Sequence, residues 1–251
     1  MTTKDGQMPV WFAVRERRFF FMSHDSDFEY FEKMAHWTFD EYGIHEECLT
    51  DWDLYGLLKG LARPDSRILD LGTAGGEKIL EFFPGCAEIL GTDYSPAMIE
   101  TARANLAASG RKNISFKVMD NLRMDVPDEY FDIVVARHTC TDPVQIMKCL
   151  KPGGHLLIRG VDKYDCWNLK LIMGGGQGCS DPVPVSIADY ENVLKAGFRD
   201  VELVPILIDV AIEGSPLDDD LLDRYIAANT VNGMIVLYRR YYGLTARKPV
   251  S

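Results

Sequence analysis

The sequence predicts an α/β fold built on a mostly parallel sheet. Short apolar runs of strand length alternate with segments of helical periodicity, and Gly, Pro or Asp separates each run from the next. Strands that are apolar throughout are buried on both faces, and such strands, joined by helices, form parallel sheets through right-handed crossovers. No internal repeat or low-complexity tract interrupts this order.

The predicted elements begin near residue 50. Four leucines between residues 54 and 61 recur at i, i+3, i+4 and i+7, which predicts a helix that ends at Arg63-Pro64-Asp65. A second helix over 96–109 has Ser95 at its N-cap, Pro96 at its first position and Gly110 beyond its end. The other expected elements are strands over 67–72, 87–93, 114–120, 131–137, 155–161, 200–206 and 241–248, and helices over 142–151, 188–197 and 215–233.

Composition restricts the class of protein. The 251 residues are 47% hydrophobic, enough for one substantial core, and 38 Asp and Glu against 27 Lys and Arg give a net charge of −11. This balance argues against charge-driven binding to nucleic acid or to an anionic membrane, because both need a basic face. No apolar run approaches the roughly 20 residues that span a bilayer, and the N-terminus lacks a signal-peptide core, so we expect a cytoplasmic protein. Six scattered cysteines without a CxxC pair are expected to be reduced thiols.

The first 50 residues differ from the rest of the chain. They are crowded with aromatic and acidic residues and show no strand alternation. We therefore expect residues 1–50 to form a lid or cap segment and residues 51–251 to form the main domain. The same segment is also consistent with packing against the sheet or against a second subunit, so a homodimer stays open.

The most informative stretch is Asp70-Leu71-Gly72-Thr73-Ala74-Gly75-Gly76, between the first predicted strand and a helix. A glycine-rich loop at this place lets the backbone approach a ligand closely and presents helix N-terminal amides to it. A dinucleotide site is a poor match, since the G-x-G-x-x-G spacing is absent and Asp70 lies inside the strand ahead of the loop.

Acidic residues also end the next two strands. Asp93 lies 23 residues after Asp70, where a carboxylate can accept both hydroxyls of a ribose, and Asp120-Asn121 is suited to hydrogen-bonding an adenine amino group. Because the carboxyl ends of parallel strands meet at one edge of a sheet, the three strand ends predict a nucleoside site.

Over residues 55–250 the sequence resembles the class I S-adenosylmethionine-dependent methyltransferases. The similar stretches are LDLGTAGG, GTDYSPAMIETAR, VMDN, FDIVVARH and LKPGGHLLI. The resemblance implies a Rossmann-like, seven-stranded, mostly parallel sheet with helices on both faces and an antiparallel last strand. It also implies S-adenosylmethionine as cofactor and S-adenosylhomocysteine as product. Ala74 replaces the middle glycine of the usual D-x-G-x-G-x-G loop, and we expect this small methyl group to be tolerated.

The resemblance also implies roles for individual residues. Asp70 would steady the loop or meet the cofactor's amino group; Gly72, Thr73, Ala74 and Gly76 would line its methionine part; Asp93 would hold the ribose; Tyr94 and Met98 would lie beside the adenine; Asp120 and Asn121 would face the adenine rim; and Arg137 with His138 would lie under the sulfonium.

Methyl transfer is a displacement at a carbon already activated by positive sulfur, so the protein mainly aligns the reactants and excludes water. His138 is the candidate general base, because an imidazole has a suitable pKa and follows the fourth strand into the crevice. The alternative is that His138 only hydrogen-bonds backbone or contacts the cofactor. No metal site is expected, since no convincing triad of carboxylates appears.

The sequence favours a methyltransferase acting on O or N of a small-molecule metabolite. The fourth strand ends in Arg-His-Thr-Cys and not in Asn/Asp-Pro-Pro-Tyr/Phe, which argues against DNA as a partner, and the acidic charge argues against RNA. Three alternatives stay open. They are methylation of RNA or protein, cleavage or cyclisation of the cofactor's aminobutyl arm with release of methylthioadenosine, and cofactor binding without turnover.

Overall fold

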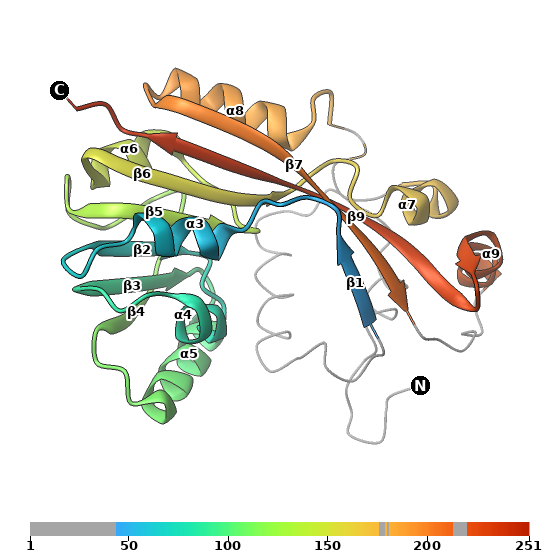
Figure 1. The fold of residues 1–251 in the computed structure, drawn as a ribbon, viewed down its shortest axis with the longest axis horizontal. Coiled ribbons are helices and arrows are strands. Elements are labelled where there is room, and N and C mark those ends of the chain that lie inside the picture. Colours follow the sequence, from blue (N-terminus) through green and yellow to red (C-terminus); the bar gives the residue numbers. More distant parts are fainter. Residues whose placement is uncertain (1–43, 176–178, 180, 213–219, 251) are drawn as a thin grey trace.

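The structure, a computed structural model, describes residues 44–175, 179, 181–212 and 220–250. These residues form one mixed sheet of nine strands with helices on both faces, which confirms the predicted α/β class (Figure 1). The strand order is β1-β7-β9-β6-β5-β2-β3-β4, and β8 pairs with β9 outside this path.

The strands are β1 (Ile44–Cys48), β2 (Arg67–Leu71), β3 (Glu88–Asp93), β4 (Ile114–Val118), β5 (Phe131–Arg137), β6 (Leu150–Val161), β7 (Arg199–Ile212), β8 (Thr230–Val231) and β9 (Met234–Arg247). The helices are α3 (Leu54–Leu61), α4 (Glu77–Phe82), α5 (Pro96–Ser109), α6 (Pro143–Cys149), α7 (Trp167–Met173), α8 (Val185–Lys195) and α9 (Asp220–Asn229).

The parallel part of the sheet contains a reversal of strand order. From β2 the chain moves outward through β3 to β4 and then returns to the other side of β2 as β5, all in parallel pairing. β6 continues the parallel part beside β5, and β9 then runs antiparallel between β6 and β7. In open α/β sheets, ligands bind outside the carboxyl ends of the strands at such a reversal. A ligand site is therefore expected where β2 and β5 end.

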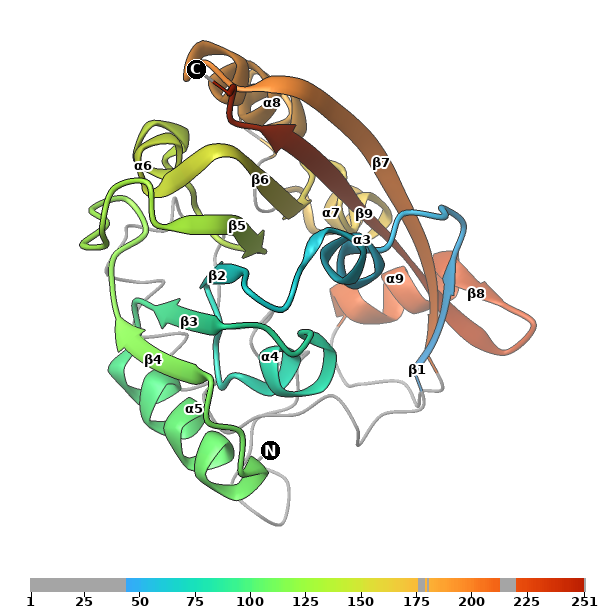
Figure 2. The same cartoon turned by 60° about the vertical axis from the view of Figure 1, so that its left-hand side comes forward.

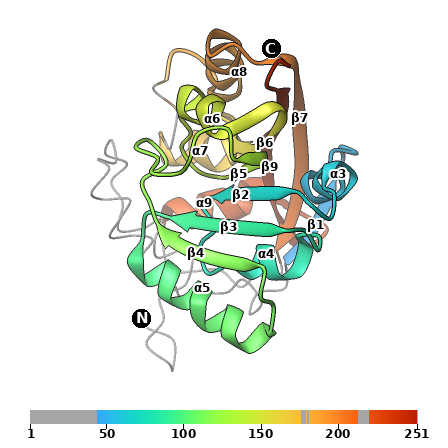
Figure 3. The same cartoon turned by 90° about the vertical axis from the view of Figure 1, so that its left-hand side faces the viewer.

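The two faces of the sheet carry different helices (Figures 2 and 3). One face packs buried side chains of β2, β3 and β5 against α3, α4 and α5, with Leu58, Ile79 and Ile99 fully buried there. The other face packs against α6 and α8, where Ile146 and Val193 are fully buried. Successive side chains of a strand point to opposite faces of the sheet. The strand register therefore shows which of the two faces each side chain at the carboxyl edge lies on.

The structure has nine strands where seven were expected. One addition is β1, which lies within the segment assigned to the cap and pairs with the edge strand β7. The other is the two-residue β8, which makes a hairpin with β9. Residues 1–43, the rest of the expected lid, lie outside the described residues.

Two strands are longer than predicted. β7 and β9 each have 14 residues and pair along most of their length, so both continue past the other strands toward α7 and α9 (Figure 1). The prediction was wrong here because charged residues break the apolar pattern, and the partner strand compensates for them: Arg240 of β9 forms an ion pair with Asp209 of β7 at 3.2 Å. Helix α7 was also missed, in a stretch expected to be a loop.

Within the described segments, no helix is long and apolar enough to cross a bilayer. All six cysteines are free thiols.

A close approach of Trp52 to the sheet gives a stability prediction. An ideal Cβ on Gly243 of β9 would lie 2.3 Å from the Trp52 indole, so the Gly243→Ala substitution should displace that ring. We expect a loss of about 1–3 kcal/mol in the free energy of unfolding, measured by denaturant titration.

The matched control is Gly60→Ala in the exposed part of α3, where no atom lies within 4 Å of the position that the added methyl group would take. This variant should gain about 0.5–1 kcal/mol through its higher helix propensity. Equal stability of the Gly243→Ala variant and the wild type would show that Trp52 does not pack tightly on β9.

Candidate active site

The loop after β2 turns through three left-handed residues. Gly72, Ala74 and Gly76 have φ values of +72°, +51° and +78°. The N–H groups of Gly72 and Thr73 both donate to the carbonyl of Thr92 at 2.8 Å, which ties the loop to β3. A left-handed residue with a Cβ costs roughly 1–2 kcal/mol, so Ala74 is accommodated at a modest cost.

Two of the glycines are required by close contacts. An ideal Cβ on Gly72 would lie 2.7 Å from Cβ of Thr139, and one on Gly76 would lie 2.7 Å from Cζ of Phe116. Gly76 is also the N-cap of α4, so the loop leads directly into that helix. The backbone of the loop therefore lies against the end of β5 on one side and against β4 on the other.

Asp70 is buried just ahead of this loop, with 7% of its surface exposed. Burial raises the pKa of Asp70 to about 7, with a smaller contribution from the nearby Asp93 carboxylate, while the Thr73 hydroxyl and the Arg137 guanidinium act in the opposite direction. The carboxyl group is therefore poised between its two protonation states near neutral pH. A cation placed beside it would favour the ionised form.

Asp93, the last residue of β3, holds the loop in place. Its Oδ2 accepts the Ala74 N–H at 2.9 Å and its Oδ1 accepts the Ser95 N–H at 3.0 Å. The Asp93 carboxylate thus fixes the loop backbone at the carboxyl end of β3. Beyond it, Tyr94 is 42% exposed, whereas Met98 is buried in the first turn of α5.

The residues after β4 include a buried polar atom that has no partner. Asp120 accepts the Leu122 N–H at 2.9 Å and so forms a turn. Asn121 is 8% exposed; its Nδ2 donates to Thr139 Oγ1 at 2.9 Å, but its buried Oδ1 has no hydrogen-bond partner among the described residues. An unpaired buried acceptor costs about 1–3 kcal/mol. An amino group of a ligand would satisfy it.

Arg137 ends β5, and His138 follows it in a left-handed conformation with φ +54°. The His138 N–H donates to the Arg159 carbonyl at 2.8 Å, and its ring stacks on Tyr241 with 4.9 Å between centroids. Desolvation lowers the pKa of His138 well below its ordinary value, and the guanidinium groups of Arg137, Arg159 and Arg239 lower it further. His138 is exposed when the whole residue is counted. Because its pKa is lowered, the imidazole ring is neutral at neutral pH.

The structure thus brings the ends of β2, β3, β4 and β5 together at one edge of the sheet, as predicted. It adds residues that the sequence analysis missed: Tyr55, Thr139, Arg159, Arg239 and Tyr241. Tyr55 of α3 lies near Asp70, Arg137 and Arg159, whose charges all act on its pKa. Arg159 could have been noticed in the sequence, because it is the one Lys or Arg in the otherwise apolar strand segment from His155 to Val161.

A hollow lies at the opposite, amino-terminal edge of the parallel strands. This pocket of about 270 Å³ is lined by Arg63, Asp132, Lys151 and neighbouring residues. Its charges satisfy one another, since Asp132 accepts from Lys151 at 2.7 Å and from the Arg67 N–H at 2.9 Å. It therefore lacks the unsatisfied groups that distinguish the carboxyl edge. Within the described part of the chain, no cluster of three or more His, Cys, Asp or Glu side chains could hold a metal ion.

Comparison with known proteins agrees with this geometry. Residues 62–183 match the family model described as a methyltransferase domain. Protein-L-isoaspartate O-methyltransferase of Myxococcus xanthus is 32% identical over 96 residues, 38% of this chain and 45% of that protein. An uncharacterized methyltransferase, YcgJ of Bacillus subtilis, is 29% identical over 109 residues, 41% of this chain and 42% of that protein. The chain thus spans less than half the length of these curated relatives.

A solved structure supports the fold over a larger share of the chain. The putative methyltransferase from Bacillus halodurans superimposes with a TM-score of 0.55 at 17% identity, covering 78% of this chain and 99% of that one. At this identity the likeness concerns the fold, and the family model supplies the assignment. Residues 62–183 therefore match a methyltransferase domain, and the chain shares the fold of that solved structure.

Proposed function

We propose that this protein transfers a methyl group from S-adenosylmethionine to O or N of a small-molecule metabolite. The observation that carries the proposal is the convergence of Asp70, Asp93, Asn121 and His138 at the carboxyl edge, from four neighbouring strand ends. Two of these residues have a chemistry that a ligand would complete: Asn121 has an unpaired buried acceptor, and the pKa of Asp70 is raised to about 7.

The residues present fit the cofactor. In the proposed arrangement the loop from Gly72 to Gly76 lines its methionine part, and Asp70 meets the amino group. Asp93 accepts the ribose hydroxyls, and the adenine lies between Tyr94, Met98 and the Asp120-Asn121 turn, with the Asn121 Oδ1 accepting from its amino group. Arg137 lies at the methionine end, because β5 is the neighbour of β2.

When bound, the cofactor supplies a methyl carbon activated by a positive sulfur. The protein's own task is to hold the acceptor atom in line with that carbon and to keep water away. His138 is neutral at neutral pH and can accept a proton from the acceptor, but the three guanidinium groups around it make it a weak base in the free protein. We propose that His138 orients the acceptor and takes up its proton.

One relative supports the small-molecule class by its name. Demethylmenaquinone methyltransferase of Deinococcus radiodurans is 30% identical over 116 residues, covering 43% of this chain and 48% of that protein. Other similar proteins act differently by name: the Myxococcus relative is a protein methyltransferase, and a structural neighbour with a TM-score of 0.50 is the [4+2]-cyclase SpnF. The test must therefore separate methyl transfer from other uses of the fold.

Product analysis by mass spectrometry tests the function directly. S-adenosylmethionine is incubated with the pure protein alone, with a small-metabolite extract, and with the RNA and protein fractions of the same cells. We expect S-adenosylhomocysteine to form only with the metabolite extract. Methylthioadenosine formed without extract would show that the cofactor is itself the substrate, and S-adenosylhomocysteine formed only with RNA or protein would contradict the small-molecule class.

The role of Asp93 gives a binding prediction. Asp93→Asn retains an acceptor for the Ala74 N–H but loses the negative charge offered to the ribose hydroxyls. Calorimetry should show weaker S-adenosylhomocysteine binding by about 1.5–3 kcal/mol, or roughly 10- to 150-fold in Kd. The control is Asp125→Asn, which makes the same charge change at an exposed carboxylate paired with Lys117. Unchanged affinity of the Asp93→Asn variant would refute the ribose assignment.

The raised pKa of Asp70 predicts that cofactor binding releases a proton. With a pKa of about 7, Asp70 is mostly protonated in the free protein at pH 6.5, and an ammonium group bound beside it would lower that pKa. Calorimetry in buffers of different ionisation enthalpy should detect a release of up to about 0.7 proton per S-adenosylhomocysteine at pH 6.5. Affinity should rise between pH 6 and pH 8.

The matched variant is Asp70→Asn, in which the release should disappear. Proton uptake by the wild type, or a release that persists in the variant, would show that Asp70 does not meet the amino group.

A further inference from the structure

Three arginines lie on one face of the sheet at the carboxyl edge. Arg137 of β5 is in register with Arg159 of β6, and Arg159 lies opposite Gly243 of β9. Two and four residues before Gly243, Tyr241 and Arg239 point to this same face, because side chains alternate along a strand. It is the face that α3 covers, since Leu54 and Leu58 of α3 pack with Leu157 of β6, which shares this face with Arg159.

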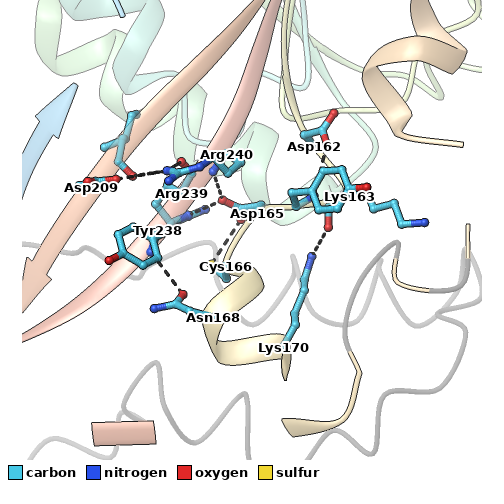
Figure 4. A network of polar contacts seen from close by, with 12 residues as sticks. Asp162, Lys163, Asp165, Cys166, Asn168, Lys170, Asp209, Tyr238, Arg239 and Arg240 are labelled. Carbon is cyan, nitrogen blue, oxygen red and sulfur yellow. Dashed lines mark hydrogen bonds and ion pairs between the residues drawn. The ribbon is translucent and has the colours of Figure 1, made fainter. Parts of the chain in front are cut away.

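Arg239 is held in a fixed position. Asp165 Oδ1 accepts from Arg239 Nε at 2.9 Å and from the Arg240 N–H at 2.8 Å (Figure 4). Asp165 is itself buried in the turn between β6 and α7. One carboxylate therefore orients Arg239 beside the crevice.

The other two arginines have no such partner. No carboxylate of the described residues forms an ion pair with Arg137 or Arg159, and the Arg159 Nε is buried without any hydrogen-bond partner there. Both arginines are half-buried, and a partly desolvated guanidinium without a carboxylate partner is costly, so an anionic ligand placed beside it would be favoured. Arginines without a carboxylate partner are unexpected in a chain whose net charge is −11.

Tyr241 organises these groups. Its ring, in a residue only 8% exposed, lies 5.0 Å from Cζ of Arg159 and 4.9 Å from Cζ of Arg239, and the His138 ring stacks on it. Arg159 and Arg239 are thus held against one aromatic ring, next to the imidazole proposed to face the acceptor.

We propose that Arg159 and Arg239, with Arg137 at their side, bind an anionic group of the methyl acceptor, a carboxylate or a phosphate. This inference rests on the proposed function. The cofactor's own carboxylate is a competing ligand, but strand order separates the two: the methionine part lies at the loop after β2, whereas β6 and β9 are two and three strands away, about 10 and 14 Å. Arg137 is close enough for the cofactor, and Arg159 and Arg239 lie beyond it.

An anion bound there would also affect His138. The positive charges of Arg137, Arg159 and Arg239 disfavour protonation of this ring, and a bound carboxylate or phosphate would offset them. His138 would then become a stronger base only when the acceptor is in place. Catalysis would in this way be coupled to recognition of the anionic group.

Calorimetry on the protein saturated with S-adenosylhomocysteine tests the proposal, because the cofactor's carboxylate then already fills its own site. The probes are inorganic phosphate and acetate at constant ionic strength, and the variant is Arg159→Gln. We expect one of the probes to bind the wild type at one site, and the variant to bind it at least tenfold more weakly. Tighter binding of phosphate indicates a phosphorylated acceptor, and tighter binding of acetate indicates a carboxylic acid.

The control is Arg240→Gln. Arg240 follows Arg239 in β9, lies on the opposite face of the sheet and forms an ion pair with Asp209. This variant should bind the probe as the wild type does. Arg159→Lys, which retains the charge, provides a second variant if Arg159→Gln does not fold, and it should lose part of the affinity because lysine lacks the planar fork.

Three results would overturn the proposal. They are no binding of either anion to the saturated wild type, equal binding by the Arg159 variants, or a tenfold loss of S-adenosylhomocysteine affinity in those variants, which would assign Arg159 to the cofactor. Failure of the wild type to bind S-adenosylhomocysteine at all would be seen first, and it would refute the proposed function together with this inference.

Discussion

Thr139 lies against the backbone of Gly72 and accepts a hydrogen bond from Asn121, and the relative positions of the strand ends at the carboxyl edge depend on these two contacts. The first contact requires glycine and sets the distance between the loop after β2 and the end of β5. The second fixes the amide of Asn121 so that its Oδ1 has no partner among the described residues. Together with the Ala74 N–H bond to Asp93, they join the ends of four strands into one rigid surface.

Charge is distributed unevenly across this surface. The β2 and β3 side carries the carboxyl groups of Asp70 and Asp93, which suit an ammonium group and hydroxyl donors. The β5, β6 and β9 side carries Arg137 and, against the Tyr241 ring, Arg159 and Arg239; Asp165 is the one carboxylate paired with them among the described residues. A ligand pair that is cationic at one end and anionic at the other would complement both sides. In the proposed arrangement this pattern would separate the cofactor from the acceptor.

The positions of the glycine-rich loop and of the acidic strand ends could be predicted from the sequence, because local residue patterns and the parallel order of the strands determine them. Glycine spacing placed the loop, and the acids at the strand ends identified Asp70, Asp93 and the Asp120-Asn121 turn. The arginine cluster could not be predicted, since Arg159 and Arg239 are 80 residues apart and meet only through the antiparallel insertion of β9 beside β6. The full lengths of β7 and β9 were missed for a related reason: their charged residues are satisfied by partners distant in the chain, such as Asp209 for Arg240.

A crystal structure of the protein with S-adenosylhomocysteine would test the central claim most directly. The account predicts ribose hydroxyls within 3.2 Å of the Asp93 carboxylate, about the limit for such hydrogen bonds. It also predicts the adenine amino group on the Asn121 Oδ1 and the methionine part against the loop at Gly72. A ligand bound elsewhere, or one bound in the crevice with its ribose away from Asp93, would contradict the assignment of this edge as the cofactor site.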